Sequence, residues 1–121
     1  MAANTGQTSP DDAWLTTLEE DVLEPDLPIV DPHRHLWLRG GYTYLIPKLA
    51  ADMDCGHNIA ATVCAECRSM YRKDGLEAEL SLGETEFVTD QTAMSASGEF
   101  GPARACAVMF GNVHMKFGAA V

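Results

Sequence analysis

A pair of histidines separated by one residue follows the first apolar run of the chain, in the sequence Asp31-Pro32-His33-Arg34-His35. Residues two apart in an extended backbone point to the same side, so His33 and His35 can present two imidazoles to one metal ion. Asp31 shares this alternation and is a candidate for orienting a ligand or for lying near a substrate. The spacing therefore predicts a metal site, with two imidazole ligands already in place.

The alternative interpretation is that both histidines are ordinary surface residues of a loop, because the motif fixes only two positions. Their place at the end of a buried strand favours the functional interpretation, since parallel sheets bind ligands at the carboxyl ends of their strands. We expect Leu36 and Trp37 to form walls of the site. A catalytic ion also needs at least one further protein ligand.

Three charged residues near the end of a second buried run are candidates for contacts with a substrate. Glu66 ends this run, and its carboxylate either binds substrate or faces solvent. Arg68 and Arg72 are candidates for binding an anionic group, although ion pairs on the surface with Asp74 or Glu77 are the simpler expectation.

The four cysteines fit reduced, mostly buried thiols better than a disulfide framework. Cys64 and Cys67 form a CxxC motif, which is also found in zinc and redox sites. Residues three apart in a strand point to opposite faces, so a shared metal or a disulfide between these two requires a turn after Ala65. We expect Cys55 and Cys106 to be core thiols.

The other two histidines have weaker claims to a site. His57 follows Gly56, a helix-stop residue, and is expected to cap the end of a helix. His114 lies shortly after the third apolar run, on the side where a site could form, and has no assigned role.

These residues must be positioned by alternating helices and strands. Ser9 as N-cap, Pro10 and the stripe Trp14, Leu15, Leu18 and Val22 predict a first helix. Apolar periodicity then predicts three strands, at 27–31, 58–66 and 103–110. Two helices are predicted between them, from Leu45 to Met53 and at 84–98, because Gly or Pro residues mark their ends. The connections include a loop at Gly40-Gly41 and an exposed loop at 68–83. Residues 111–121 read as the start of a further helix. The order predicts an α/β fold with parallel strands.

Composition narrows the functional classes. The 121 residues include 18 acidic and only 8 basic side chains, a net charge of −10 that disfavours nucleic acid and anionic membrane surfaces as partners. No apolar run is long enough for a membrane span, and residues 1–9 lack the features of a signal peptide. We therefore expect a cytoplasmic protein.

The sequence resembles the amidohydrolase-related family of metal-dependent TIM-barrel hydrolases, and its lactonase-like branch in particular. The resemblance runs from about Leu27 to Val121 and is carried by LPIVDPHRHLW at 27–37, GHN at 56–58, ATV at 61–63, ECR at 66–68, MYR at 70–72 and GETEFV at 83–88. It implies a (β/α)₈ barrel in which His33 and His35 bind a divalent metal, zinc in first place, and in which Glu66 contacts the substrate.

The resemblance further implies a small-molecule substrate, namely a lactone or related carbonyl ester that activated water hydrolyses. Residues 1–26 would be an acidic helical extension, and residues 27–121 a partial barrel of three strands. Such barrels need about 250 residues, so we expect this chain to be an N-terminal portion that is inactive alone.

Four alternatives remain open. The family also contains metal-independent lactonases and decarboxylases. The chain could instead be a non-catalytic α/β unit that associates with itself or with a partner chain, because an uncovered sheet edge favours association. A small redox or zinc module built on the CxxC motif is the last alternative.

Overall fold

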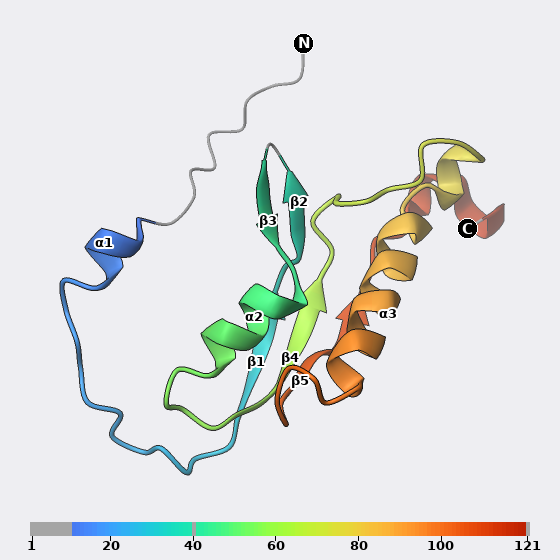
Figure 1. Cartoon of the computed structure of the whole chain (residues 1–121). Coiled ribbons are helices and arrows are strands. Elements are labelled where there is room, and N and C mark those ends of the chain that lie inside the picture. Colours follow the sequence, from blue (N-terminus) through green and yellow to red (C-terminus); the bar gives the residue numbers. More distant parts are fainter. Residues whose placement is uncertain (1–10, 40, 121) are drawn as a thin grey trace.

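The structure, a computed structural model, describes residues 11–39 and 41–120 (Figure 1). Its centre is a three-stranded parallel sheet of β1 (Ile29–Arg34), β4 (Ile59–Ala65) and β5 (Arg104–Phe110), in the order β1-β4-β5. Small and β-branched residues dominate β4, as suits a central strand. The predicted α/β class and the parallel strands are confirmed.

Two helices cover one face of this sheet (Figure 1). In α2 (Ile46–Met53), Pro47 occupies the first turn, and Ile46, Leu49 and Met53 are buried at helical spacing. The longer α3 (Leu82–Ala96) packs Val88 into the same core, which also receives Cys64 and Cys106 from the sheet. Both helices lie within two residues of their predicted bounds.

The segment between β1 and α2 forms a hairpin where only a loop was predicted. In it, β2 (Trp37–Arg39) pairs with the antiparallel β3 (Tyr42–Tyr44). Gly41 has a φ of +85°, in the left-handed region that glycine adopts without strain. Gly40 lies outside the described residues.

The prediction of a long first helix is wrong for the described residues. Only α1 (Asp12–Leu15) forms, and Asp11 caps it by accepting a hydrogen bond from the Trp14 backbone N–H. Ser9 and Pro10, the predicted cap and first residue, lie outside the described part. The side chains of Trp14 and Leu18 are 69% and 70% exposed, so no packing extends the single turn.

Two short 3₁₀ segments complete the chain: η1 (Glu77–Glu79) lies in the predicted exposed loop, and η2 (Met115–Ala120) follows β5. The helix expected to begin after residue 110 is therefore a 3₁₀ segment that bends at Gly118. Within the described residues, no helix has both the length and the apolar character that a membrane crossing requires.

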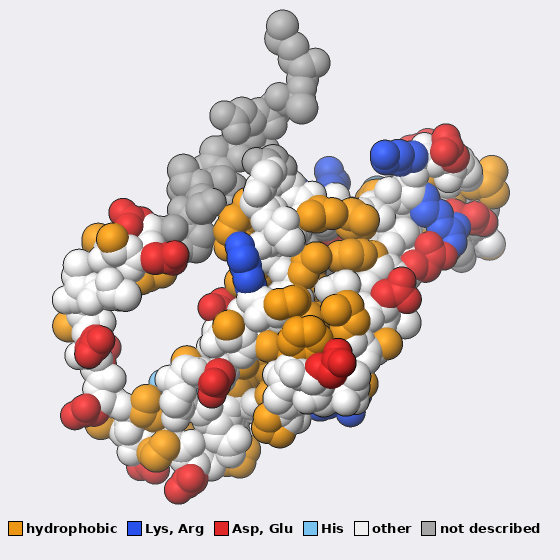
Figure 2. Space-filling view, in the orientation of Figure 1, with side chains coloured by type: hydrophobic (Ala, Val, Ile, Leu, Met, Phe, Trp, Pro, Cys, Tyr) orange, Lys and Arg blue, Asp and Glu red, His pale blue; other side chains and the backbone are white. Residues whose placement is uncertain are grey.

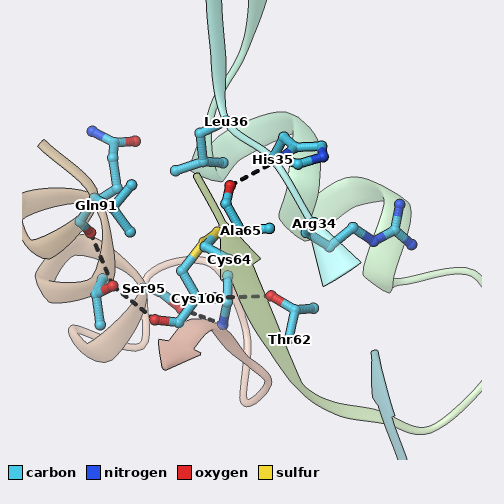
Figure 3. Close-up of a disulfide and its surroundings, with 12 residues drawn as sticks. Arg34, His35, Leu36, Thr62, Cys64, Ala65, Gln91, Ser95 and Cys106 are labelled. Atoms are coloured by element: carbon cyan, nitrogen blue, oxygen red, sulfur yellow. Dashed lines mark hydrogen bonds between the residues drawn. A yellow bond between two sulfur atoms is a disulfide. The ribbon is translucent and has the colours of Figure 1, made fainter. Parts of the chain in front are cut away.

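Two cysteines that were expected to be reduced form a disulfide (Figure 3). Cys64 of β4 and Cys106 of β5 are both buried, and their Cα atoms are 4.9 Å apart. The β4–β5 register shifts between Ala61 and Val63, and Cys106 adopts a φ of +51° there. The register pairs Cys64 with Met109, so Cys106 reaches Cys64 from within the irregular part of β5. Cys55, the other expected core thiol, is instead exposed.

Candidate metal centre

The two histidines of the HxH motif lie together at the carboxyl end of β1. This strand continues to Arg34, three residues past its predicted end, and therefore includes His33. The Nε2 atoms of His33 and His35 are 3.1 Å apart, and the two rings meet edge to face. The side chain of His33 is exposed and that of His35 is half-buried. The extended backbone thus brings both imidazoles to one point, as the spacing predicted.

The ring of His35 is fixed by the neighbouring strand (Figure 3). Its Nδ1 lies 2.9 Å from the carbonyl oxygen of Ala65, the last residue of β4. A carbonyl oxygen only accepts, so Nδ1 carries the proton and donates it to this bond. The lone pair of His35 then lies on Nε2, the atom that is 3.1 Å from His33 Nε2. A backbone carbonyl behind one ring nitrogen is the usual support for a histidine that binds metal through the other.

The geometry of the pair suits a shared ion. Two nitrogens bound at about 2.05 Å to one tetrahedral zinc ion lie about 3.3 Å apart. The observed 3.1 Å separation is close to this value. The described residues contain no group of three or more His, Cys, Asp or Glu side chains placed to hold a metal. A metal ion at this place would therefore have two protein ligands among the described residues, and water, substrate or other residues would have to supply the rest.

The other residues predicted near the pair lie partly elsewhere. Trp37 does flank the site, with its ring centroid 5.2 Å from that of His35. Leu36 is buried in the hydrophobic core and forms no wall, since its neighbour His35 takes the outward position. Asp31 accepts from the backbone N–H of His33 and pairs with Arg34, so its carboxylate does not orient either imidazole. The Ala65 carbonyl oxygen has that role.

A second polar cluster lies at the same edge of the sheet, at the ends of β4 and β5. Glu66 Oε2 accepts hydrogen bonds from Tyr71 Oη at 3.0 Å and from the Arg68 backbone N–H at 3.2 Å. Tyr71 Oη in turn accepts from Asn112 Nδ2 at 3.0 Å. Burial is the main cause of a raised Tyr71 pKa. These two hydrogen bonds hold Glu66 toward its own loop, with no hydrogen bond to either imidazole.

Tyr71 and Asn112 were not assigned a role from sequence. For Asn112, a signal was present: a polar residue two positions after a buried strand lies at the edge where ligands bind in parallel sheets. For Tyr71 there was none, because its position depends on the course of the loop. In that loop Arg68 and Met70 both have positive φ, a conformation that costs energy in residues other than glycine.

The CxxC motif forms no joint site. Cys64 is bonded to Cys106, whereas Cys67 lies just past the end of β4 and donates from Sγ to Glu84 Oε1 at 3.2 Å. Burial, together with the bond to Glu84, raises the pKa of Cys67 to about 12. The thiol is therefore protonated at neutral pH and a poor nucleophile.

The remaining candidate residues lie away from the histidine pair. Arg72 forms ion pairs with Glu86 and Glu79, which are not the predicted partners Asp74 and Glu77. Arg68 and His57 are exposed, and α2 ends at Met53, so His57 does not cap it. The ring of His114 packs edge to face against Phe117.

Comparison with known proteins finds no matching family model, no similar curated protein and no similar solved structure.

Proposed function

We propose that His33 and His35 bind a divalent metal ion, zinc in first place, and that the protein is a metal-dependent hydrolase of lactones or related carbonyl esters. The observation that carries the proposal is the 3.1 Å separation of the two Nε2 atoms, with His35 Nδ1 bonded to the Ala65 carbonyl. The hydrolase assignment rests in addition on the family resemblance of residues 27–121.

Each protein group has a definite task in this proposal. The Ala65 carbonyl fixes His35 so that its Nε2 lone pair points toward His33, which lies at the end of β1. An ion bound there would polarise a substrate carbonyl and promote ionisation of a water molecule. Glu66 contacts the substrate: Tyr71 and Arg68 bind its Oε2, which leaves Oε1 for a hydroxyl group of the substrate.

We also infer that the sheet is a three-strand portion of a (β/α)₈ barrel. In such a barrel, helices cover the outer face of the sheet and the inner face is apolar. Here α2 and α3 cover one face (Figure 1). The register of the strands places Val30, Val108 and Phe110 together on the other face, and all three are exposed. Consecutive parallel strands lie side by side, which is also the barrel order.

Metal binding is the first test. Equilibrium dialysis against zinc should give one bound ion, and His33→Ala and His35→Ala should each abolish binding, because one imidazole alone holds zinc weakly. His114→Ala is the matched control, since it removes an imidazole outside the site and should leave binding unchanged. Unchanged zinc content in the double variant His33→Ala/His35→Ala would overturn the proposal.

Hydrolysis is the second test, and it uses the complete product of the gene that encodes this chain. A panel of lactones and esters should be hydrolysed in a reaction that a chelator stops and that His33→Ala abolishes. Glu66→Gln should mainly raise KM, as expected for a substrate contact. Hydrolysis that persists in the chelator would show a metal-independent reaction and overturn the role of the ion.

A second candidate function is supported by the uncovered sheet face. Val108 is 62% exposed and Phe110 is 52% exposed. An apolar face of this kind is typical of a surface that binds another chain. On this alternative the chain is a non-catalytic α/β unit that self-associates, and its mass by light scattering exceeds that of a monomer while zinc is not bound.

A further inference from the structure

A cavity of about 450 Å³ lies at the amino ends of β4 and β5, at the edge of the sheet opposite the histidine pair. Its floor is apolar and combines the end of α2 with the segments that lead into both strands: Met53, Ile59, Phe100, Pro102 and Ala103. The polar side chains at it are Asp54, His57 and Asn58. The volume is in the range of cavities that take a small ligand or a few apolar side chains.

The N-terminal arm, defined as residues 11–28, has apolar side chains that nothing covers. Trp14, Leu18 and Leu23 are among the most exposed apolar residues of the described chain, and Leu23 is 86% exposed. Figure 2 shows the arm standing away from the sheet and helices, with acidic and apolar side chains on it. Val22 is the only residue of the arm that is half-buried. The arm therefore carries unpartnered apolar surface.

The arm contacts the segment that runs along the cavity, at Gly56 next to the lining residue His57 and at the lining residue Asn58. The Val22 side chain lies over Gly56, where an added Cβ would be 3.3 Å from Val22 Cγ2, and the φ of +88° at this position also favours glycine. Asn58 Nδ2, at the cavity itself, donates to the Asp26 carbonyl at 3.2 Å. These two contacts attach the arm beside the cavity.

We propose that this cavity is the docking site of the chain's own N-terminal arm, which binds it as an amphipathic helix over residues 11–22. In such a helix Trp14, Leu15, Leu18 and Val22 lie on one stripe, and Val22 already packs on Gly56, next to the lining residue His57. Leu18 is one turn from Val22, about 6 Å along the axis, and on this proposal it is the side chain that enters the cavity.

In the structure the arm is not docked, and only one turn of this helix forms. A helix of about 12 residues is marginal in water without tertiary packing, so α1 alone is what the Asp11 cap maintains. The tether at Val22 and Asn58 keeps the arm near its own cavity. The high effective concentration that results favours docking within one molecule over docking between copies.

Fluorescence of Trp14 tests the proposal in the full chain. Trp37→Phe leaves Trp14 as the only tryptophan, because the chain has two. We expect its emission to be blue-shifted relative to the same protein in denaturant, and its quenching by acrylamide to be several times weaker. Ala51→Glu should abolish both differences, since Ala51 lines the cavity on the exposed side of α2 and a glutamate there blocks the entrance.

Matched variants distinguish the loss of docking from the loss of the folded structure. Ala51→Ser keeps the cavity open and should leave the Trp14 signal unchanged. Leu18→Asp should abolish the signal, whereas Leu38→Asp, an equally polar change at an exposed leucine of the hairpin, should not. A fully exposed Trp14 in the parent protein would overturn the proposal. So would a signal that disappears on dilution, because the arm would then bind another copy. Ala51 and Leu18 lie outside the proposed metal site, so Ala51→Glu and Leu18→Asp, made with Trp37 intact, should bind zinc as the parent does, and the test is independent of the proposed function.

Discussion

At the scale of single residues, two threonine hydroxyl groups hydrogen-bond to the backbone of Cys106, which has a positive φ. Thr62 Oγ1 accepts from the Cys106 backbone N–H at 2.9 Å, and Thr92 Oγ1 donates to the Cys106 carbonyl at 2.8 Å. Thr62→Val keeps the shape but leaves the buried N–H without a partner, which we expect to lower the free energy of unfolding by about 1–3 kcal/mol. Urea denaturation measures this loss. Thr43→Val, at an exposed strand position, should change stability by less than about 0.5 kcal/mol.

The four cysteines should differ in reactivity. At pH 8 without reductant, iodoacetamide should modify exposed Cys55 first, while Cys64 and Cys106 stay unmodified in their disulfide. Cys67 should react slowly: at four pH units below its pKa of about 12, only about 10⁻⁴ of it is thiolate. A rise from pH 8 to 9 increases that fraction about tenfold.

Mass spectrometry of the labelled protein checks this order. Glu84→Gln serves as the control, because it removes the carboxylate that helps to raise the Cys67 pKa, and it should speed labelling of Cys67 alone. Equal rates for Cys67 and Cys55 in the parent protein would contradict the burial of this thiol.

The histidine pair was predictable because its geometry depends only on a local rule. Alternation in extended backbone places His33 and His35 on one side wherever the strand lies. The Ala65 carbonyl and the cluster of Glu66, Tyr71 and Asn112 are different, because each joins residues that are far apart in sequence. Only the register of β1, β4 and β5 brings these groups together.

At the scale of elements, the loop after β4 packs directly against the start of α3. A Cβ on Gly83 would lie 2.5 Å from the Arg72 backbone nitrogen and 2.6 Å from the Met70 carbonyl oxygen. Gly83→Ala would normally stabilise a helix, but here we expect a loss of about 1–3 kcal/mol from the backbone clash. Urea denaturation of the variant and the parent would measure this loss of unfolding free energy. Ala93→Gly, at an exposed position of the same helix, calibrates helix propensity at about 0.5–1 kcal/mol. A Gly83→Ala protein as stable as the parent would rule out this close contact.

An element could be predicted from the sequence when burial of its own apolar side chains stabilises it. The bounds of α2, β4, α3 and β5 followed from apolar periodicity, because these elements bury the side chains that the pattern contains. The helix predicted at 9–22 has the same kind of pattern, yet only α1 forms where nothing covers the stripe. The hairpin strands are three residues each, too short for a periodic signal.

At the scale of the whole molecule, an apolar sheet face competes with a high net charge. Val30, Val108 and Phe110 favour association of copies through the face that α2 and α3 leave uncovered, while the charge of −10 opposes it. The repulsion is screened beyond about 8 Å at physiological ionic strength, whereas burial of apolar area is not. We therefore expect association that strengthens with salt.

Val108→Glu tests which face is involved. It places a charge in the middle of the uncovered face and should reduce the mass measured by light scattering to that of the 13.1 kDa monomer. Val113→Glu makes the same change at an exposed valine beyond the end of β5 and should leave the association intact. If both variants associate as the parent does, the contact lies elsewhere on the molecule. If the parent is itself monomeric at high salt, the uncovered face does not drive self-association, and the case for the second candidate function is lost.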